Sequence, residues 1–341
     1  MSSVRIVLFA DTHLGFDYPI KPRVERRRRG PDFFDNFRRV LDYARESKPD
    51  LIVHGGDLFF RARIPPPIVD LVYGDIFAFA SEGIPMVIVP GNHERSILPS
   101  SLFLSHPGIF IFDQPRTFKF NFGDSNLFLS GFPCQRNSVR SEFPSLIART
   151  GWKTIEGGGK LLCFHQTVEG AKVGPSGYTF KSGADVIRRS DLPVDALAVL
   201  SGHIHRNQIL GDFAVGNKMS PVVIYPGSTE RTSFAERDEQ KGFYDIEFSP
   251  NSTGDLQVQK INFIQLYARP MEDLIIENTV QINTLNDFIR AHTADMNPDS
   301  IIRLRCEEGL DPAVKSQITS QLLRQVLPET MNYQYSGDFR Q

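Results

Sequence analysis

Five short polar segments, each placed directly after an apolar run, constrain this chain more than any other feature. The segments are residues 11–13, 56–57, 91–94, 165 and 202–205. The runs before them are short and rich in β-branched or aromatic residues, as buried strands are; they cover residues 4–10, 51–53, 86–89, 161–164 and 196–200. Functional groups of open α/β sheets gather beyond the carboxyl ends of the strands. One sheet edge is therefore expected to collect all five segments.

The side chains in these segments are typical ligands of divalent cations. Seven carboxylate, imidazole and amide side chains are candidate ligands: Asp11, His13, Asp57, Asn92, His165, His203 and His205. Any one of these segments alone is more often a turn or a hydrogen-bonded histidine. Five in this order, with five of the eight histidines in the chain, favour two cations that share one carboxylate and leave room for a phosphate. Gly56, Gly91 and Gly202 are expected to let the backbone turn sharply beside the cations. The predicted chemistry is phosphoester hydrolysis.

The order and the residues of these segments resemble the motifs of the calcineurin-like metallophosphoesterases. Within that family they are similar to the Mre11/SbcD branch of DNA repair nucleases. The resemblance rests on four stretches, at residues 11–15 (DTHLG), 55–59 (GGDLF), 202–206 (GHIHR) and 225–236, which contains YPGS and SFAE. It implies an α/β fold, in which a sandwich of two mixed β-sheets flanked by helices is followed by a small α+β capping domain.

The resemblance also implies a role for each candidate. Asp11, His13 and His205 would hold one cation, Asn92, His165 and His203 the other, and Asp57 would bridge the two. The cations in that family are usually Mn²⁺, and they polarise the phosphodiester and generate a hydroxide for in-line attack. His93 matches the family's catalytic histidine, which stabilises charge on the phosphate or protonates the leaving oxygen.

One residue departs from the family pattern. Phe60 stands three residues after Asp57, where Mre11-like nucleases often carry His and protein phosphatases carry Asp. A phenyl ring neither donates nor accepts a hydrogen bond, so His93 would lose an orienting partner or the phosphate would lose a contact. Arg61 or Arg63 would compensate by binding phosphate, unless both are solvated loop arginines.

Length and composition fit a two-domain protein. The chain has 341 residues, of which 40% are hydrophobic and 23% charged, an ordinary globular composition. We expect a nuclease domain over residues 1–265 and a capping domain, which binds DNA, over residues 266–341. The run at residues 4–10 is too short for a signal peptide or a membrane span, so the cytoplasm is the expected compartment. Cys134, Cys163 and Cys306 form no close pair and are expected to be buried thiols.

Net charge says little about nucleic acid, because it is only −2. A local cluster, Arg23 and residues 26–29, precedes a helix expected over residues 32–46. It lines the approach to the site or is a solvated arginine run; both interpretations stay open. The remaining expected elements are a hairpin of residues 117–122 and 127–132, strands at 222–225, 242–248 and 301–305, helices at 280–294 and 312–327, and a loop at 170–183 over the site.

The predicted function is a two-metal DNA nuclease that acts in double-strand break or DNA-end repair. The resemblance implies a homodimer that works with a coiled-coil ATPase of the Rad50/SbcC type. Two alternatives remain open. A phosphatase or phosphodiesterase for another substrate would use the same ligands, although the Asp-Arg-Gly element of protein phosphatases is absent after Asp57. The second alternative is a DNA-end-binding subunit that cleaves weakly because of Phe60.

Overall fold

The computed structural model describes residues 2–18, 28–99, 106–211 and 220–335. The chain divides into two compact units. The first comprises residues 1–16 and 30–267, and the second comprises residues 17–29 and 268–341.

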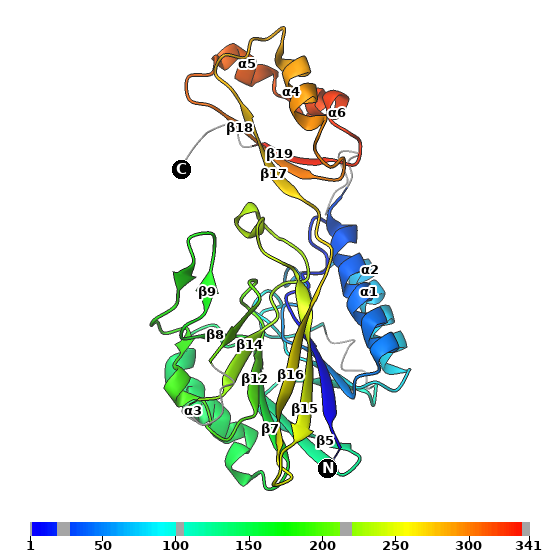
Figure 1. The fold of residues 1–341 in the computed structure, drawn as a ribbon, viewed down its shortest axis with the longest axis vertical. Helices are drawn as coiled ribbons and strands as arrows, with labels where there is room; N and C mark the ends of the chain where they lie inside the picture. The colour runs from blue at the N-terminus through cyan, green and yellow to red at the C-terminus, as the bar shows by residue number, and fades with distance from the viewer. Residues whose placement is uncertain (1, 19–27, 100–105, 212–219, 336–341) are drawn as a thin grey trace. The chain divides into compact units, whose positions relative to one another are not determined.

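The first unit contains a six-stranded mixed sheet, and the N-terminal strand β1 is one of its inner strands (Figure 1). Its order is β16-β15-β1-β2-β3-β4. Strands β1 to β4 are parallel, whereas β15 is antiparallel to both β1 and β16. Their bounds are β1 Val4–Phe9, β2 Leu51–His54, β3 Met86–Ile88, β4 Ile109–Ile111, β15 Gly242–Pro250 and β16 Leu256–Gln265.

A second six-stranded mixed sheet has the order β13-β14-β12-β7-β6-β5. The four central strands are parallel, and each edge strand is antiparallel to its neighbour. Their bounds are β5 Arg116–Phe122, β6 Ser125–Gly131, β7 Gly159–Phe164, β12 Ala198–Ser201, β13 Gln208–Leu210 and β14 Val222–Tyr225. Two short pairs follow β7: β8 Thr167–Val168 with β11 Val186–Ile187, and β9 Lys172–Val173 with β10 Tyr178–Thr179.

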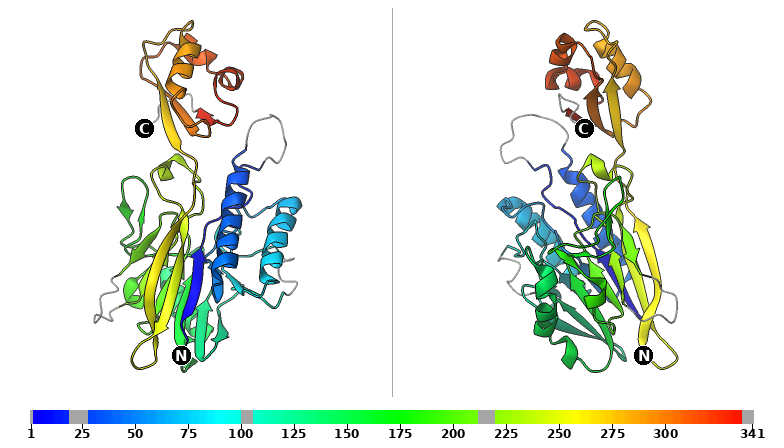
Figure 2. Two further views of the ribbon diagram at one scale, coloured as in Figure 1. Left: turned by 45° about the vertical axis from the view of Figure 1, so that its right-hand side comes forward. Right: turned by 90° about the vertical axis from the view of Figure 1, so that its left-hand side faces the viewer.

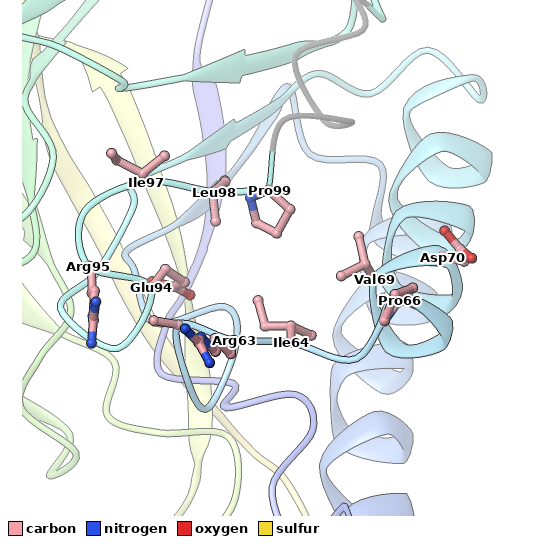
Figure 3. Close-up of a pocket in the computed structure, with 11 residues that line it drawn as sticks. Arg63, Ile64, Pro66, Val69, Asp70, Glu94, Arg95, Ile97, Leu98 and Pro99 are labelled. Atoms are coloured by element: carbon pink, nitrogen blue, oxygen red, sulfur yellow. The ribbon is translucent and has the colours of Figure 1, made fainter. Parts of the chain in front are cut away.

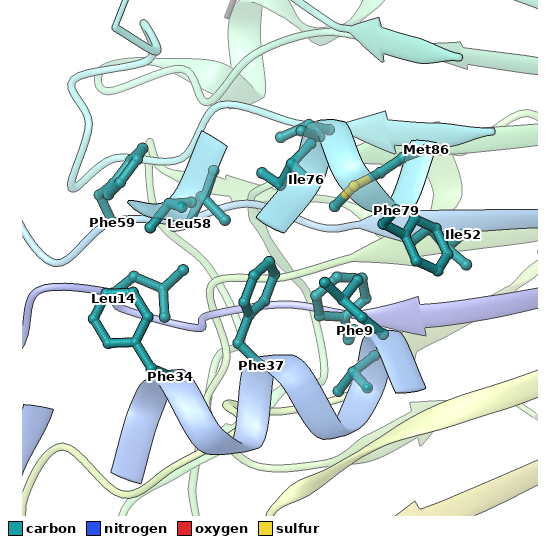
Figure 4. Packing of buried hydrophobic residues seen from close by; sticks show 14 of the residues in the cluster. Phe9, Leu14, Phe34, Phe37, Ile52, Leu58, Phe59, Ile76, Phe79 and Met86 are labelled. Carbon is teal, nitrogen blue, oxygen red and sulfur yellow. The ribbon is translucent and has the colours of Figure 1, made fainter. Parts of the chain in front are cut away.

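Alternation along the strands builds the layers of this unit. Ile6 and Leu8 point into the core shared by the two sheets, whereas Val7 and Phe9 belong to a core on the outer face. Helices α1 (Gly30–Ser47) and α2 (Pro66–Ala80) cover that outer face (Figure 2). Figure 4 shows Phe37 of α1 beside Phe9 of β1. Helix α3 (Val139–Thr150) packs on the outer face of the second sheet. The predicted sandwich of two mixed sheets flanked by helices is confirmed.

Several predicted boundaries differ from the structure. The hairpin turn has two residues, Gly123 and Asp124, because Ser125 already pairs with Phe122. The helix expected at residues 312–327 is two helices, α5 Pro312–Gln317 and α6 Ser320–Val326. They are separate because Thr319 caps α6, its side chain accepting a hydrogen bond from the Leu322 amide, and an N-cap residue leaves helical geometry.

The second unit is a small α/β structure. Its parallel sheet has the order β17 Met271–Ile276, β18 Ile301–Cys306 and β19 Asn332–Tyr335. Helix α4 (Leu285–Thr293), shorter than the expected 280–294, connects β17 to β18, and α5 and α6 connect β18 to β19. Apolar residues of the strands and all three helices share one core. Across the described residues of both units, no helix has the length and apolarity needed to traverse a lipid bilayer.

Candidate metal centre

The five polar segments lie at the carboxyl ends of five parallel strands, three in the first sheet and two in the second. Asp11 and His13 follow β1, Asp57 follows β2, and Asn92 follows β3. His165 directly follows β7, and His203 and His205 follow β12. Backbone hydrogen bonds join the segments: the Asp11 amide donates to the Gly56 carbonyl at 2.8 Å, and the His13 amide to the Asp57 carbonyl at 3.1 Å. Because β1, β2 and β3 belong to the first sheet and β7 and β12 belong to the second, both sheets contribute side chains to one cluster.

The three glycines of the polar segments are required mainly by close packing. A Cβ atom at Gly91 would lie 2.1 Å from the Asp57 carboxylate, and one at Gly56 would lie 2.1 Å from the His165 ring. A Cβ at Gly202 would lie 2.5 Å from the Gly55 carbonyl oxygen. Only Gly56 among the three has a positive φ, at 115°, so the expected sharp turn applies to Gly56, and Gly91 and Gly202 make room for neighbouring atoms.

Four of the candidate ligands have left-handed backbone conformations. Their φ angles are 52° for Asp11, 45° for His13, 53° for Asp57 and 81° for His203. Such conformations are uncommon for residues other than glycine and cost free energy, and they cluster at functional sites. The fold keeps these four residues in place at that cost.

One group of donors surrounds Asp11. The Nε2 atoms of His13 and His205 are 3.0 Å apart, and Nε2 of His205 lies 3.8 Å from the Asp11 carboxylate. Donor atoms of Asp11, His13 and His205 all lie within 4.8 Å of one another. The backbone amide of His203 donates to the Asp11 carboxylate at 3.0 Å, which fixes the orientation of this carboxylate.

A second group of donors surrounds the Asn92 amide oxygen. Nε2 of His165 lies 3.0 Å from this oxygen, and Nδ1 of His203 lies 2.9 Å from it. Asp57 stands between the two groups. Its carboxylate is 3.3 Å from Nε2 of His165. A carboxylate oxygen of Asp57 also lies within 4.8 Å of a ligand atom of His13 and of one of Asp11. All seven candidate ligands predicted from the sequence are brought together.

Hydrogen bonds determine which ring nitrogen of His165 faces the centre. Its Nδ1 lies 2.9 Å from the Gly55 carbonyl oxygen. Because a carbonyl only accepts, Nδ1 carries the hydrogen. In the neutral ring, the lone pair is then on Nε2, which points toward Asn92 and Asp57. This is the tautomer that a metal ligand needs.

Burial and neighbouring charges shift the pKa values of the cluster in opposite directions. Burial lowers the pKa of His13, and it lowers that of His203 to about 3, so both rings are neutral. Burial raises the pKa of Asp11 to about 6, against the influence of His165 and His205. Burial also lowers the pKa of His165, but the charge and hydrogen bond of Asp57, the charge of Asp11 and the hydrogen bond to the Gly55 carbonyl together outweigh burial and raise this pKa to about 9. Asp57 in turn has a lowered pKa, since the charge and hydrogen bond of His165 outweigh its burial.

His93 stands at the edge of the cluster. The exposed fraction of its side chain is 33%, and its Nε2 is 3.8 Å from the Asp57 carboxylate. Its Nδ1 lies 2.6 Å from the backbone carbonyl oxygen of Phe60. The main chain at Phe60 therefore supplies an orienting partner for His93. The other expectation, that the phosphate loses a contact at this position, stays a prediction. The Phe60 ring packs against Phe16 at 4.8 Å between ring centroids.

Two buried residues that the sequence analysis left without a role hold the segments together. The Glu94 carboxylate accepts from the Phe59 amide at 2.6 Å and from the Gly91 amide at 2.8 Å, which ties the loop after β2 to the loop after β3. His54 accepts from the Gly56 amide at 3.2 Å and contacts the Thr12 hydroxyl at 3.0 Å. The Gly91-Asn92-His93-Glu94 pattern was visible in the sequence, but one partner of Glu94, the Phe59 amide, lies 35 positions away in the sequence.

The arginines proposed for phosphate lie on the loop after Phe60. The Arg61 guanidinium lies 5.5 Å from the centre of the Phe60 ring. Arg63 lines a pocket of about 670 Å³ together with Glu94, Arg95 and apolar residues of α2 and of the loop after β3 (Figure 3). This places an exposed cationic side chain beside the loop that carries His93.

The arginine cluster near the N-terminus is only partly described. Arg23, Arg26 and Arg27 lie outside the described residues. Arg28 donates to the Asp17 carboxylate at 3.3 Å, and the Arg29 side chain is buried. These two arginines are therefore not a solvated run.

The cluster fits a pair of divalent cations. Ligand atoms about 2.1 Å from one cation and at right angles to each other lie about 3.0 Å apart. The separations between His13 and His205, between Asn92 and His165, and between Asn92 and His203 are 3.0, 3.0 and 2.9 Å. The mixture of imidazole, carboxylate and amide donors suits Mn²⁺, Fe²⁺ or Zn²⁺.

This chain is similar to a family profile and to several known proteins. The sequence profile of the calcineurin-like phosphoesterases matches residues 4–207. A protein named DNA double-strand break repair protein Mre11 from Methanocaldococcus jannaschii is 27% identical over 286 residues, which are 81% of this chain and 70% of that protein. A protein of the same name from Methanococcus maripaludis is 25% identical over 281 residues, 76% of this chain and 68% of that protein. The structure of a dimetal phosphatase from Danio rerio aligns with a TM-score of 0.45 and 14% identity over 77% of this chain and 98% of that one.

Proposed function

The chain belongs to the calcineurin-like phosphoesterase family, and from this premise we propose that it is a two-metal-dependent DNA nuclease that acts in the repair of DNA ends. The observation that carries the proposal is the convergence of seven candidate ligand side chains from five strand ends, with Asp57 between the two groups. The relatives named Mre11 support DNA as the substrate.

The two groups of donors support the following ligand set. Asp11, His13 and His205 would hold one cation, Asn92, His165 and His203 would hold the other, and Asp57 would be shared between them. When bound, the two cations, which we propose are Mn²⁺, supply Lewis-acid polarisation of the phosphodiester and activation of water. The protein contributes fixed tautomers, oriented carboxylates and a buried floor, so the donors need little reorganisation when they bind.

His93 acts on the phosphate from the open side of the centre. Its Nδ1 hydrogen is held by the Phe60 carbonyl, so Nε2 is the atom that meets the substrate. In the protonated ring, Nε2 donates a hydrogen bond to a phosphate oxygen or a proton to the leaving oxygen. We propose that Arg61 and Arg63 bind phosphate groups of the DNA strand that lie some distance from the cleaved bond.

The remaining assignments are proposals. We propose that residues 1–265 form the nuclease domain, that residues 266–341 form a cap that contributes to DNA binding, and that the protein forms a homodimer. We also propose that it works with an ATPase of the Rad50/SbcC type, which the relatives named Mre11 support.

A comparison of substrates tests the proposed function. Purified protein depleted of metal and reloaded with Mn²⁺ is assayed on double-stranded and single-stranded DNA, a phosphopeptide and bis(p-nitrophenyl) phosphate. We expect Mn²⁺-dependent cleavage of DNA and of the diester, lost in Asp57→Ala. Turnover of the phosphopeptide without cleavage of DNA would replace the proposal with a phosphatase. Binding of DNA ends without cleavage in any metal would replace it with a binding subunit.

A further inference from the structure

The Ser233-Phe234-Ala235-Glu236 stretch contains a buried carboxylate that contacts a candidate ligand. Glu236 ends the 3₁₀ turn Phe234–Glu236, and only 7% of the residue is exposed. Its Oε1 lies 3.0 Å from Nδ1 of His205 and accepts from the Thr232 hydroxyl at 2.5 Å. Its Oε2 accepts from Nζ of Lys241 at 2.6 Å and from the Ser228 hydroxyl at 3.3 Å. Both carboxylate oxygens are therefore held by hydrogen bonds.

Lys241 holds the far side of this arrangement. Its side chain is fully buried, which is rare for lysine unless it is paired. Nζ donates to Glu236 at 2.6 Å, to Glu239 at 3.1 Å and to the backbone carbonyl of His205 at 3.1 Å. One ammonium group therefore fixes both the Glu236 carboxylate and the main chain of the residue that Glu236 contacts.

This arrangement determines the tautomer of His205. A carboxylate only accepts, so the hydrogen of His205 is on Nδ1, and in the neutral ring the lone pair is on Nε2. That Nε2 faces Nε2 of His13 at 3.0 Å and the Asp11 carboxylate at 3.8 Å. A buried ion pair contributes little to stability by itself, because desolvation offsets the attraction. The Lys241–Glu236 pair is thus better explained by what it orients.

Resting on the function proposed above, we propose that Glu236, held by Lys241, is a positioning residue that aims Nε2 of His205 at the cation of the Asp11 group. Carboxylates that orient metal-binding histidines typically change metal affinity about 10–100-fold when they are removed. The effect should be confined to one of the two cations. His165, which belongs to the other group, has its own orienting partner in the Gly55 carbonyl.

Mn²⁺ titration of the metal-depleted full chain tests this inference. Free Mn²⁺ is followed by electron paramagnetic resonance, which gives stoichiometry and affinity without an activity assay. We expect two Mn²⁺ in the wild type. In Glu236→Ala, one site should weaken about 10–100-fold and the other should keep its affinity. Glu236→Gln, whose amide oxygen still accepts from Nδ1, should recover part of the loss.

Glu239→Gln is the matched control. Glu239 is a neighbouring carboxylate that accepts from Lys241 and from Arg206, and it offers the same chemistry at a different position. We expect both sites of this variant to keep wild-type affinity. Thermal unfolding of each metal-depleted variant separates a loss of fold from a loss of orientation. If Glu236→Ala does not fold, Glu236→Gln is compared with the wild type by the ¹⁵N shifts of the His205 ring, where we expect a smaller fraction of the Nδ1-protonated tautomer.

The possible outcomes are distinguishable. A wild type that binds no Mn²⁺ contradicts the proposed two-metal function itself. A wild type with two Mn²⁺ and a folded Glu236→Ala with both affinities unchanged overturns the role of Glu236 alone. Equal losses in Glu236→Ala and Glu239→Gln, or equal weakening of both sites, also overturn it, since either result indicates a general structural effect. If Glu236→Ala does not fold, an unchanged tautomer of the His205 ring in Glu236→Gln also overturns the role of Glu236.

Discussion

Nδ1 of His93 lies 2.6 Å from the carbonyl oxygen of Phe60, so the main chain orients this histidine whichever side chain occupies position 60. Replacing the ring should therefore change catalysis little. We expect Phe60→His and Phe60→Leu to retain DNA cleavage within about threefold of the wild type, because the carbonyl acceptor remains in both. A large rise in the rate of Phe60→His would show instead that a second imidazole at this position takes part in the reaction.

His93→Ala removes the proton donor and keeps every proposed ligand. We expect cleavage to fall about 10²–10⁴-fold, the usual contribution of a general acid or base. The number of bound Mn²⁺ ions, measured by elemental analysis after gel filtration, should remain two. Loss of a metal ion from this variant would mean that His93 is a ligand.

Gly91→Ala is expected to disrupt the centre through packing. The new Cβ would lie 2.1 Å from the Asp57 carboxylate, and the loop after β3 has to move to relieve the clash. Mn²⁺ binding should weaken more than tenfold, as measured by titration. Gly74→Ala is the matched control. Gly74 lies inside α2 with open space around it, so this substitution should stabilise the protein by about 0.5–1 kcal/mol and leave Mn²⁺ binding unchanged.

Mn²⁺ affinity should depend on pH. Burial lowers the pKa of His165, but the charges of Asp57 and Asp11 and the hydrogen bonds to Asp57 and Gly55 together raise this pKa to about 9, so this ring is protonated near neutral pH before a cation binds. The cation displaces this proton, and the apparent affinity therefore rises with pH, by about tenfold per unit for one proton, up to about pH 9. Calorimetry in buffers of different ionisation enthalpy measures the proton release. Release of no proton at pH 7.5 would contradict the raised pKa.

Asp245 is expected to stabilise the first sheet in a pH-dependent way. Its carboxylate accepts from Arg5 of β1 at 2.8 Å and also from Tyr43 of α1. These hydrogen bonds outweigh burial and lower the pKa of Asp245. The stabilisation is present above the unfolded-state pKa of about 4 and is lost as the pH falls through the lower folded-state value.

Asp245→Asn tests this in urea. The free energy of unfolding should fall by about 1–3 kcal/mol at pH 7, and the difference from the wild type should shrink as the pH is lowered below about 4. A difference that stays constant down to pH 2 would show that the charge of Asp245 is not its cause. Glu247→Gln, on the same strand, is the control and should behave like the wild type at both pH values.

Much of the fold and the donor set was predictable because both depend on local patterns. Short apolar runs that end in Asp, Asn or His identified the strands β1, β2, β3, β7 and β12 and the side chains beyond them. Strand ends that lie side by side need no further information to place their side chains together. Helix α1 likewise follows from its apolar period, and its observed start at Gly30 is two residues before the expected one.

The sequence by itself determined which residues are candidate ligands and that they meet at strand ends. Tertiary structure decided which hydrogen-bond partner each of them has. Three contacts join residues that are 31 to 35 positions apart in the sequence. They are the contact of His93 with the Phe60 carbonyl, of Glu94 with the Phe59 amide, and of His205 with Glu236. Backbone carbonyls carry no residue identity, and the direction of a buried carboxylate depends on packing from both sheets. These long-range contacts, which select tautomers and orient ligands, exist only after the chain has folded and the loops beyond the strand ends lie side by side.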